Sequence, residues 1–99
     1  MKLFLLKIFK KKEINLYKIE FDKKVKKFLV KTEQHIFDKF QEKIEVLALN
    51  PHDNNLDIRK LKGQNGYRLR IGKYRFLYEV FEDKILIYFF DANSRGDIY

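Results

Sequence analysis

The sequence predicts a single α+β domain in which an N-terminal strand and a helical hairpin precede an antiparallel sheet, in the order β-α-α-β-β-β. Three observations support this prediction. Apolar and polar residues alternate over residues 16–21, apolar residues recur every three or four positions over residues 23–49, and strand-like runs return after residue 66. The last runs are joined by very short turns, which only antiparallel neighbours can have. We expect about four strands, with the hairpin covering one face of the sheet.

The first half of the chain contains the first strand and both helices. The alternation in LYKIEF (residues 16–21) predicts a half-buried strand. Asp22 follows it and is a suitable N-cap for the first helix. A second helix is expected to begin at Thr32 and to run to about Leu49. It ends before Pro51, because the residue preceding a proline avoids helical angles.

The second half contains three strand-like runs, Tyr67–Ile71, Tyr74–Phe81 and Ile85–Asp91. Gly72-Lys73 predicts a tight turn between the first two, and residues 82–84 predict another between the second and third. The third run is apolar at nearly every position. It should therefore be an interior strand of the sheet.

The stretch from residue 61 to residue 78 is strongly basic. No carboxylate occurs between Asp57 and Glu79. The basic residues of this region are Arg59, Lys60, Lys62, Arg68, Arg70, Lys73 and Arg75. Because successive side chains of a strand point to opposite faces, Arg68 and Arg70 should share the face that Leu69 does not use. The pattern predicts a strand with cations on its open face.

The arginines are confined to the second half of the chain. All five lie at or after residue 59, whereas the first 50 residues use only lysine as the basic residue. Arginine carries a planar fork of donors that binds phosphate or carboxylate in a bidentate manner. The distribution favours an anion-binding role for these residues; the alternative is a set of solvated charges on a sheet face.

Composition places the chain among small, basic, folded domains. Its 99 residues are 45% hydrophobic, carry a formal net charge of +8 and contain no cysteine. Nucleic acid is the first partner that such a charge predicts, followed by acidic proteins and then by anionic membranes. The lack of cysteine fits a cytoplasmic location.

We interpret residues 1–15 as an N-terminal extension and residues 16–99 as the domain. The apolar run near the start is interrupted by Lys7 and is too short to cross a membrane.

Known catalytic motifs are missing from the sequence. There is no P-loop, GxGxxG, HExxH, zinc-ligand spacing or carboxylate pair, and neither His35 nor His52 has a partner at a useful spacing. What remains is a set of cations and tyrosines. Such a set suits phosphoryl transfer, in which stabilisation of an anionic transition state matters more than a protein nucleophile. RNA can supply its own nucleophile through the 2′-hydroxyl.

Several stretches of the sequence form a recognisable set. They are the LKG of residues 61–63, the runs YRLRIGKYRFLYEV and ILIYFF, and a final Arg followed by a Tyr. On these features, residues 17–99 resemble the RelE/ParE toxin superfamily. The resemblance implies a RelE-like fold and a toxin of a type II toxin–antitoxin system. RelE-like members are ribosome-dependent, metal-independent endoribonucleases that cleave messenger RNA through 2′-hydroxyl attack on the scissile phosphate. ParE-like members share the fold and act on DNA gyrase.

The resemblance also implies roles for particular residues. Arg75 matches the strand arginine that contacts the scissile phosphate, and Arg95 the tail arginine that stabilises the transition state or the leaving group. Tyr99 matches the C-terminal tyrosine that stacks on a base and assists proton transfer. These three are the expected catalytic residues. Ser94 stands where a histidine often precedes the tail arginine, so the general base is expected to be Tyr99 or a water molecule.

Four further basic residues are expected to bind substrate. Arg68 and Arg70 match positions at which RelE-like enzymes place basic residues on the strand that faces the RNA, and Lys62 and Lys73 flank that strand. Arginine does not lose its proton in proteins, so Arg68 and Arg70 should act only through their charge. No metal site and no cofactor are expected.

The resemblance implies several partners. They are an acidic, RelB-like antitoxin, messenger RNA on the ribosome, and ribosomal RNA, with the toxin a monomer within a hetero-oligomeric complex. Two alternatives stay open: a ParE-like inhibitor of DNA gyrase, and a catalytically inactive module that only binds an antitoxin. Arg95 and Tyr99 favour the nuclease, because ParE-type activity does not need a tyrosine near phosphate.

Overall fold

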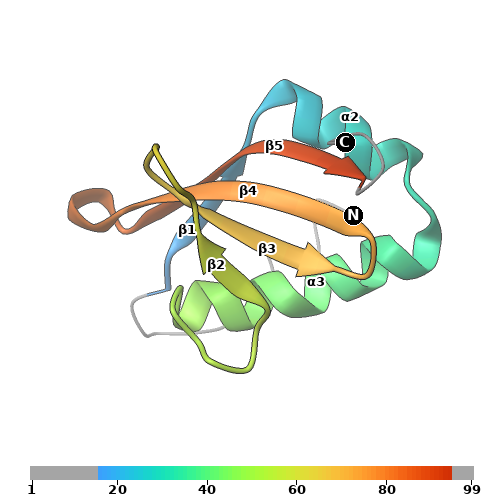
Figure 1. Cartoon of the computed structure of the whole chain (residues 1–99). Coiled ribbons are helices and arrows are strands. Elements are labelled where there is room, and N and C mark those ends of the chain that lie inside the picture. The colour runs from blue at the N-terminus through green and yellow to red at the C-terminus, as the bar shows by residue number, and fades with distance from the viewer. Residues whose placement is uncertain (1–15, 95–99) are drawn as a thin grey trace.

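The computed structural model describes residues 16–94 (Figure 1). The N-terminal extension, Arg95 and Tyr99 lie outside the described residues. The elements are β1 (Lys18–Phe21), α2 (Lys23–Lys31), α3 (Gln34–Leu49), β2 (Ile58–Lys60), β3 (Tyr67–Ile71), β4 (Tyr74–Phe81), the 3₁₀ turn η1 (Glu82–Lys84) and β5 (Leu86–Ser94). No helix in the described part of the chain is long and apolar enough to span a membrane.

The strands form one sheet in the order β1-β5-β4-β3-β2. The predicted α+β fold class is confirmed, but the sheet has five strands instead of about four, and it is mixed instead of antiparallel. β1 pairs in parallel with β5, because the chain crosses over through both helices and the rest of the sheet before returning. The added strand β2 pairs with β3 and has only three residues. As predicted, β5 is an interior strand.

The helix boundaries follow from their caps. Asp22 caps α2 as predicted: its Oδ2 accepts a hydrogen bond from the backbone N–H of Lys24 at 3.0 Å, which lowers the pKa of the Asp22 carboxyl. The expected start of the second helix at Thr32 is wrong. The Thr32 backbone N–H donates to the carbonyl of Phe28, so Thr32 closes α2, and α3 begins two residues later. α3 ends at Leu49, as expected.

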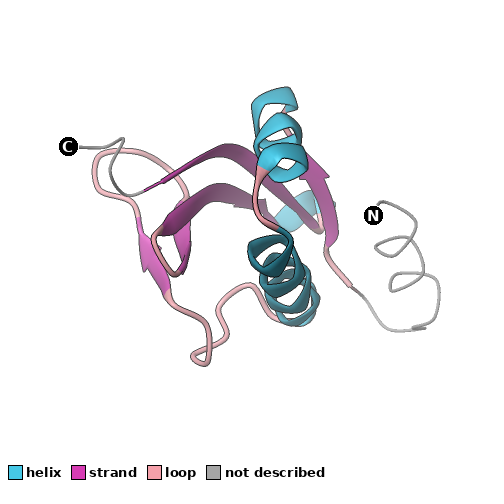
Figure 2. Cartoon of the chain, turned by 90° about the vertical axis from the view of Figure 1, so that its right-hand side faces the viewer, coloured by secondary structure: helices cyan, strands magenta, loops and turns pink. Residues whose placement is uncertain are grey.

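Both helices pack against the same face of the curved sheet (Figure 2). Phe40 of α3 is the centre of the contact, with its ring centroid 4.5 Å from that of Phe76 in β4 and 5.4 Å from that of Phe89 in β5. All three side chains are buried. Tyr78 is buried beside them and its hydroxyl donates to the carbonyl of Pro51. Within residues 16–94, no helix covers the opposite face, which we call the open face.

Candidate nucleic-acid interface

Three of the predicted site residues come together on the open face. In β3, Leu69 and Ile71 are buried, and Arg68 and Arg70 alternate with them. Arg70 lies directly opposite Arg75 of β4 in the antiparallel register. Because opposite residues of an antiparallel pair share a face and have Cβ atoms about 5 Å apart, the two guanidinium groups flank the same patch of surface. The sheet thus gathers Arg68, Arg70 and Arg75 from two neighbouring strands.

One carboxylate bridges two of these arginines. Arg68 donates from Nη2 to Oδ1 of Asp57, and Arg70 donates from Nε to Oδ2 of the same group, each at 2.9 Å. The backbone N–H of Arg70 also donates to the Asp57 carbonyl oxygen at 3.0 Å. Arg59 of β2 lies opposite Arg68, so a fourth arginine borders the cluster. We call Asp57, Arg59, Arg68, Arg70 and Arg75 the arginine cluster.

The arginine cluster combines burial with strong repulsion. The Arg68 side chain is only 14% exposed, whereas that of Arg70 is 40% exposed. Burial lowers the pKa of the Arg68 guanidinium, the Asp57 carboxylate raises it, and the three other arginines lower it. Arg68 nevertheless stays cationic at neutral pH, since the pKa of arginine starts far above that range. The patch therefore carries a concentrated positive charge that does not change with pH near neutrality.

The two predicted substrate-binding lysines lie outside the strands that carry the arginines. Lys62 is exposed in the loop before β3, and Lys73 is exposed in the turn after it, so they flank opposite ends of the strand. The Lys73 ammonium lies 5.6 Å from the centroid of the Tyr74 ring. Both lysines thus lie beyond the ends of β3, and not on the strands that carry the arginines.

Lys73 instead contributes to a basic hollow of about 510 Å³ between α2 and the ends of β4 and β5. The residues that line this hollow are Lys24, Lys27, Phe28, Lys31, Thr32, Glu33, Lys73, Tyr74, Ala92 and Ser94. Four of them are lysines and only one is acidic. We call it the lysine hollow. It adjoins Ser94, the last residue that the structure describes.

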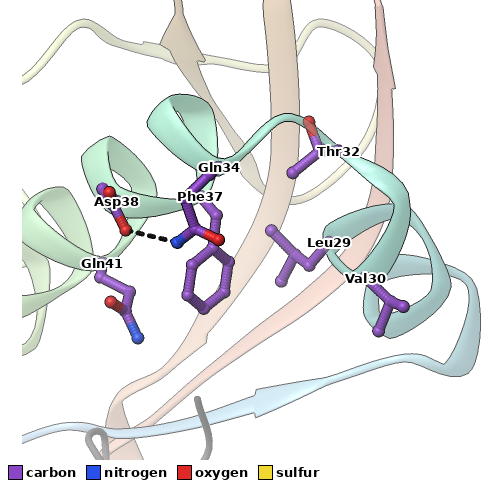
Figure 3. Close-up of a pocket in the computed structure, with 7 residues that line it drawn as sticks. All are labelled: Leu29, Val30, Thr32, Gln34, Phe37, Asp38 and Gln41. Carbon is purple, nitrogen blue, oxygen red and sulfur yellow. Dashed lines mark hydrogen bonds between the residues drawn. The ribbon is translucent and has the colours of Figure 1, made fainter.

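Another hollow, of about 450 Å³, lies at the elbow between α2 and α3 (Figure 3). Leu29, Val30 and Phe37 give it an apolar floor, and the Gln34 side-chain amide donates to Asp38 at 2.8 Å at its rim. No cationic side chain lines it. It is therefore unsuited to phosphate, and it adjoins the lysine hollow at Thr32, which lines both.

The contribution of Asp57 was not predicted from the sequence. The signal was present, because Leu56 and Ile58 alternate with Asp57 and Arg59, which is the pattern of a short half-buried strand. Leu56 is buried and Ile58 packs against the core, which leaves Asp57 and Arg59 for the open face. Residues 16–94 contain no group of three His, Asp or Glu side chains placed to hold a metal ion.

Comparison with solved structures identifies the class of protein. The chain superposes on the RelE–RelB complex of Pyrococcus horikoshii with a TM-score of 0.73 and 28% identity, covering 82% of this chain and 97% of that one. The RelB–RelE complex of Methanococcus jannaschii gives a TM-score of 0.66 and 35% identity, covering 80% and 93%. The fold is that of the RelE toxins.

Sequence comparison then gives the family. The family described as the ParE toxin of type II toxin–antitoxin systems, parDE, matches residues 18–99. A candidate toxin of Methanocaldococcus jannaschii, RelE1, is 40% identical over 74 residues, which cover 72% of this chain and 82% of that protein. The chain belongs to the RelE/ParE toxin superfamily of type II toxin–antitoxin systems. The resemblance that the sequence predicted is confirmed.

Proposed function

We propose that this toxin is an endoribonuclease that cleaves messenger RNA on the ribosome in the cytoplasm. The observation that carries the proposal is the position of Arg75 directly opposite Arg70, beside Arg68, on the open face of the sheet. A scissile phosphate at this patch would meet donors from two strands. Guanidinium groups held in place before the reaction stabilise charge that develops on phosphate, and such preorganised donors are a large source of rate enhancement.

The proposed reaction is an attack by the ribose 2′-oxygen on the adjacent phosphorus. The 2′-hydroxyl proton passes to a base, the bond from phosphorus to the 5′-oxygen breaks, and that oxygen takes up a proton. The products are a 2′,3′-cyclic phosphate and a free 5′-hydroxyl. Arg75 would contact the equatorial phosphate oxygens, and Arg95 would neutralise charge on the phosphate or the leaving oxygen.

The base in this proposal is Tyr99 or a water molecule. Arginine cannot serve, because it holds its proton throughout the working pH range. Tyr78 cannot serve either, since it is fully buried and burial raises the pKa of its hydroxyl. Hydrogen bonding to Glu82 raises the pKa of Tyr17, and burial, reinforced by a hydrogen bond to Asp22, raises that of Tyr88. These three tyrosines would therefore remain protonated near neutral pH.

A second part of the proposal is a protein partner. The relatives from P. horikoshii and M. jannaschii were solved as complexes of RelE with RelB. We propose that this toxin, as a monomer, binds a RelB-like antitoxin in the same way. An acidic segment would suit the net charge of +8, and it would cover the arginine cluster or cross the helices.

The deciding experiment is primer extension on a translated message after the toxin is induced. Cleavage within codons, only on translated message, is the expected result. A matched strain that expresses the Arg75→Ala variant is the control. Intact message together with DNA gyrase inhibition would favour the ParE-like alternative, and intact message with no gyrase effect would leave the inactive antitoxin-binding module.

The lysine hollow should contribute to RNA binding and not to the chemical step. We expect the triple change Lys27→Gln, Lys31→Gln and Lys73→Gln to weaken ribosome binding and to flatten the dependence of log Kd on log salt by about two units. Single-turnover cleavage of bound message should change by less than about threefold, because the hollow does not include the arginine cluster.

The matched control for this prediction replaces the same amount of charge elsewhere. Lys39, Lys43 and Lys84 do not line the hollow, so their triple change to Gln should flatten the salt dependence less. Equal effects of the two triple variants on binding would show that only net charge matters. A collapse of cleavage with unchanged binding would place the hollow in the active site.

A further inference from the structure

Asp57 is the carboxylate that the structure places within the arginine cluster. Its two oxygens accept hydrogen bonds from two different arginines. Oδ1 accepts from Nη2 of Arg68, and Oδ2 accepts from Nε of Arg70, both at 2.9 Å. Its own main chain is fixed as well, because its carbonyl oxygen accepts the backbone N–H of Arg70 at 3.0 Å. Three hydrogen bonds thus lock Asp57 to β3. The carboxylate is half-exposed and lies at the edge of the surface that would meet RNA.

Two arginines at positions i and i+2 of a strand need such a partner to adopt a single arrangement. Their Cα atoms are about 7 Å apart on one face, so the two like charges repel each other. Arginine also has several rotatable bonds, and confining one to a single rotamer has an entropic cost. A carboxylate shared by both guanidinium groups offsets the repulsion and selects one rotamer for each.

The geometry leaves donors available for an anion. Arg70 uses only Nε toward Asp57, and in the described part of the chain its Nη1 and Nη2 make no other hydrogen bond. Its side chain is 40% exposed, so these Nη groups can be reached from solvent. Arg75 lies directly opposite Arg70 in the register. Asp57 thus holds one edge of the Arg70 guanidinium and leaves the remaining edge for phosphate.

We infer that Asp57 is a positioning residue of this toxin, which orients Arg68 and Arg70 toward the scissile phosphate without touching the RNA itself. The inference rests on the proposed nuclease function. It predicts that Asp57 has opposite effects on the affinity for RNA and on the rate of cleavage. Its negative charge opposes RNA binding, whereas its hydrogen bonds favour the chemical step.

Asp57→Asn tests this prediction, because it removes the charge and nearly preserves the shape. The variant should bind RNA at least as tightly as the wild type, since the cluster gains one unit of net positive charge. Single-turnover cleavage of bound message should fall about 10- to 100-fold, the size expected when reacting groups are misplaced by about 1 Å. Asp57→Glu should recover part of the rate, because it restores a carboxylate within reach of both arginines.

The matched control is Asp83→Asn. Asp83 is an exposed carboxylate in η1, outside the arginine cluster, and its replacement makes the same change in net charge. Affinity and rate should both stay within about twofold of the wild type. Thermal melting of all three variants separates loss of fold from loss of positioning.

Nuclear magnetic resonance can test the hydrogen bond between Arg70 and Asp57 without any cleavage assay. In a ¹⁵N-labelled toxin–antitoxin complex or free toxin, the Arg70 Nε–H should exchange slowly with water, because it is hydrogen-bonded to Asp57. In Asp57→Asn this exchange should become at least about tenfold faster, and in Asp83→Asn it should not change.

The outcomes separate this inference from the proposed function. If Asp57→Asn cleaves as fast as the wild type or faster, or if exchange at Arg70 Nε–H does not change, the positioning role is overturned. A parallel loss of binding, rate and melting temperature would reduce Asp57 to a structural residue. If no variant cleaves, the wild type included, but Arg70 exchange still depends on Asp57, the nuclease proposal falls and the orientation of the arginines by Asp57 stands.

Discussion

Replacing Arg75 by alanine should lower the single-turnover rate of message cleavage by about 10²–10³-fold, the loss that follows removal of one preorganised donor to a transition-state oxygen. Arg95→Ala should cost a similar factor, on the basis of the role that the family resemblance implies for it. Arg75→Lys should recover little, because a point charge cannot replace a bidentate fork. The measurement is cleavage on programmed ribosomes at saturating toxin, which separates rate from affinity.

Arg59→Ala is the matched control for this prediction. Arg59 also belongs to the arginine cluster, but it lies on β2, two strands away from Arg75 in the sheet. Its loss should weaken binding and alter the rate by less than about tenfold, since it removes a nearby charge and no transition-state contact. Full activity in both Arg75→Ala and Arg95→Ala, with the fold intact by melting, would remove the nuclease proposal.

The largest loss of stability from a single methyl group is expected at Gly66. This glycine has φ of +122°, and a Cβ built on it would lie 2.7 Å from the carbonyl oxygen of Tyr78, a backbone atom of the neighbouring strand. Gly66→Ala should therefore lower the free energy of unfolding by about 3 kcal/mol, from the strained backbone and the overpacked contact together. Chemical denaturation followed by circular dichroism would measure it.

Gly63 provides the comparison. It also has a positive φ, of +74°, but no atom lies within 4 Å of its Cβ position. Gly63→Ala should cost about 1 kcal/mol, the penalty of a left-handed backbone alone. Equal losses at the two glycines would mean that β3 and β4 can separate enough to admit the methyl group, and the close approach at Gly66 would then not constrain the sheet.

Local pattern predicted the elements of this fold well. The bounds of β3 and β4 match the predicted runs, and Asp22 caps α2 as expected, because alternation and capping depend on neighbouring residues. The error at Thr32 has a local cause too. Threonine can begin a helix, but here its N–H completes the last turn of the preceding one.

Strand pairing between segments far apart in the sequence was harder to predict from local pattern. Nothing near residues 18–21 says that they will lie parallel to β5, since that partner is selected by the crossover of both helices. β2 is too short for its alternation to stand out, and its pairing with β3 depends on register. The sheet was therefore predicted with one strand too few and with the wrong orientation at one edge.

The same contrast applies to the site. Arg68 and Arg70 were placed on one face by alternation alone, and the register then adds Arg75. Lys62 and Lys73 are close to these arginines in sequence but lie in the loop and the turn at opposite ends of β3, where strand alternation does not fix the face that a side chain occupies. Asp57 is the converse case. It lies eleven positions before Arg68 in the sequence, and its carboxylate accepts a hydrogen bond from the Arg68 guanidinium.

The parallel pairing of β1 with β5 affects how the toxin is made. Lys18 lies opposite Leu86 and Phe21 opposite Phe89, so the edge strand can find its partner only after nearly the whole domain has been synthesised. Pairings between such distant segments form late and slow folding. A nascent chain that stops before β5 leaves β1 unpaired and Phe40 without one of its aromatic neighbours. Toxin released early from a truncated message would therefore lack β5, and one edge of β4, the strand that carries Arg75, would be unpaired.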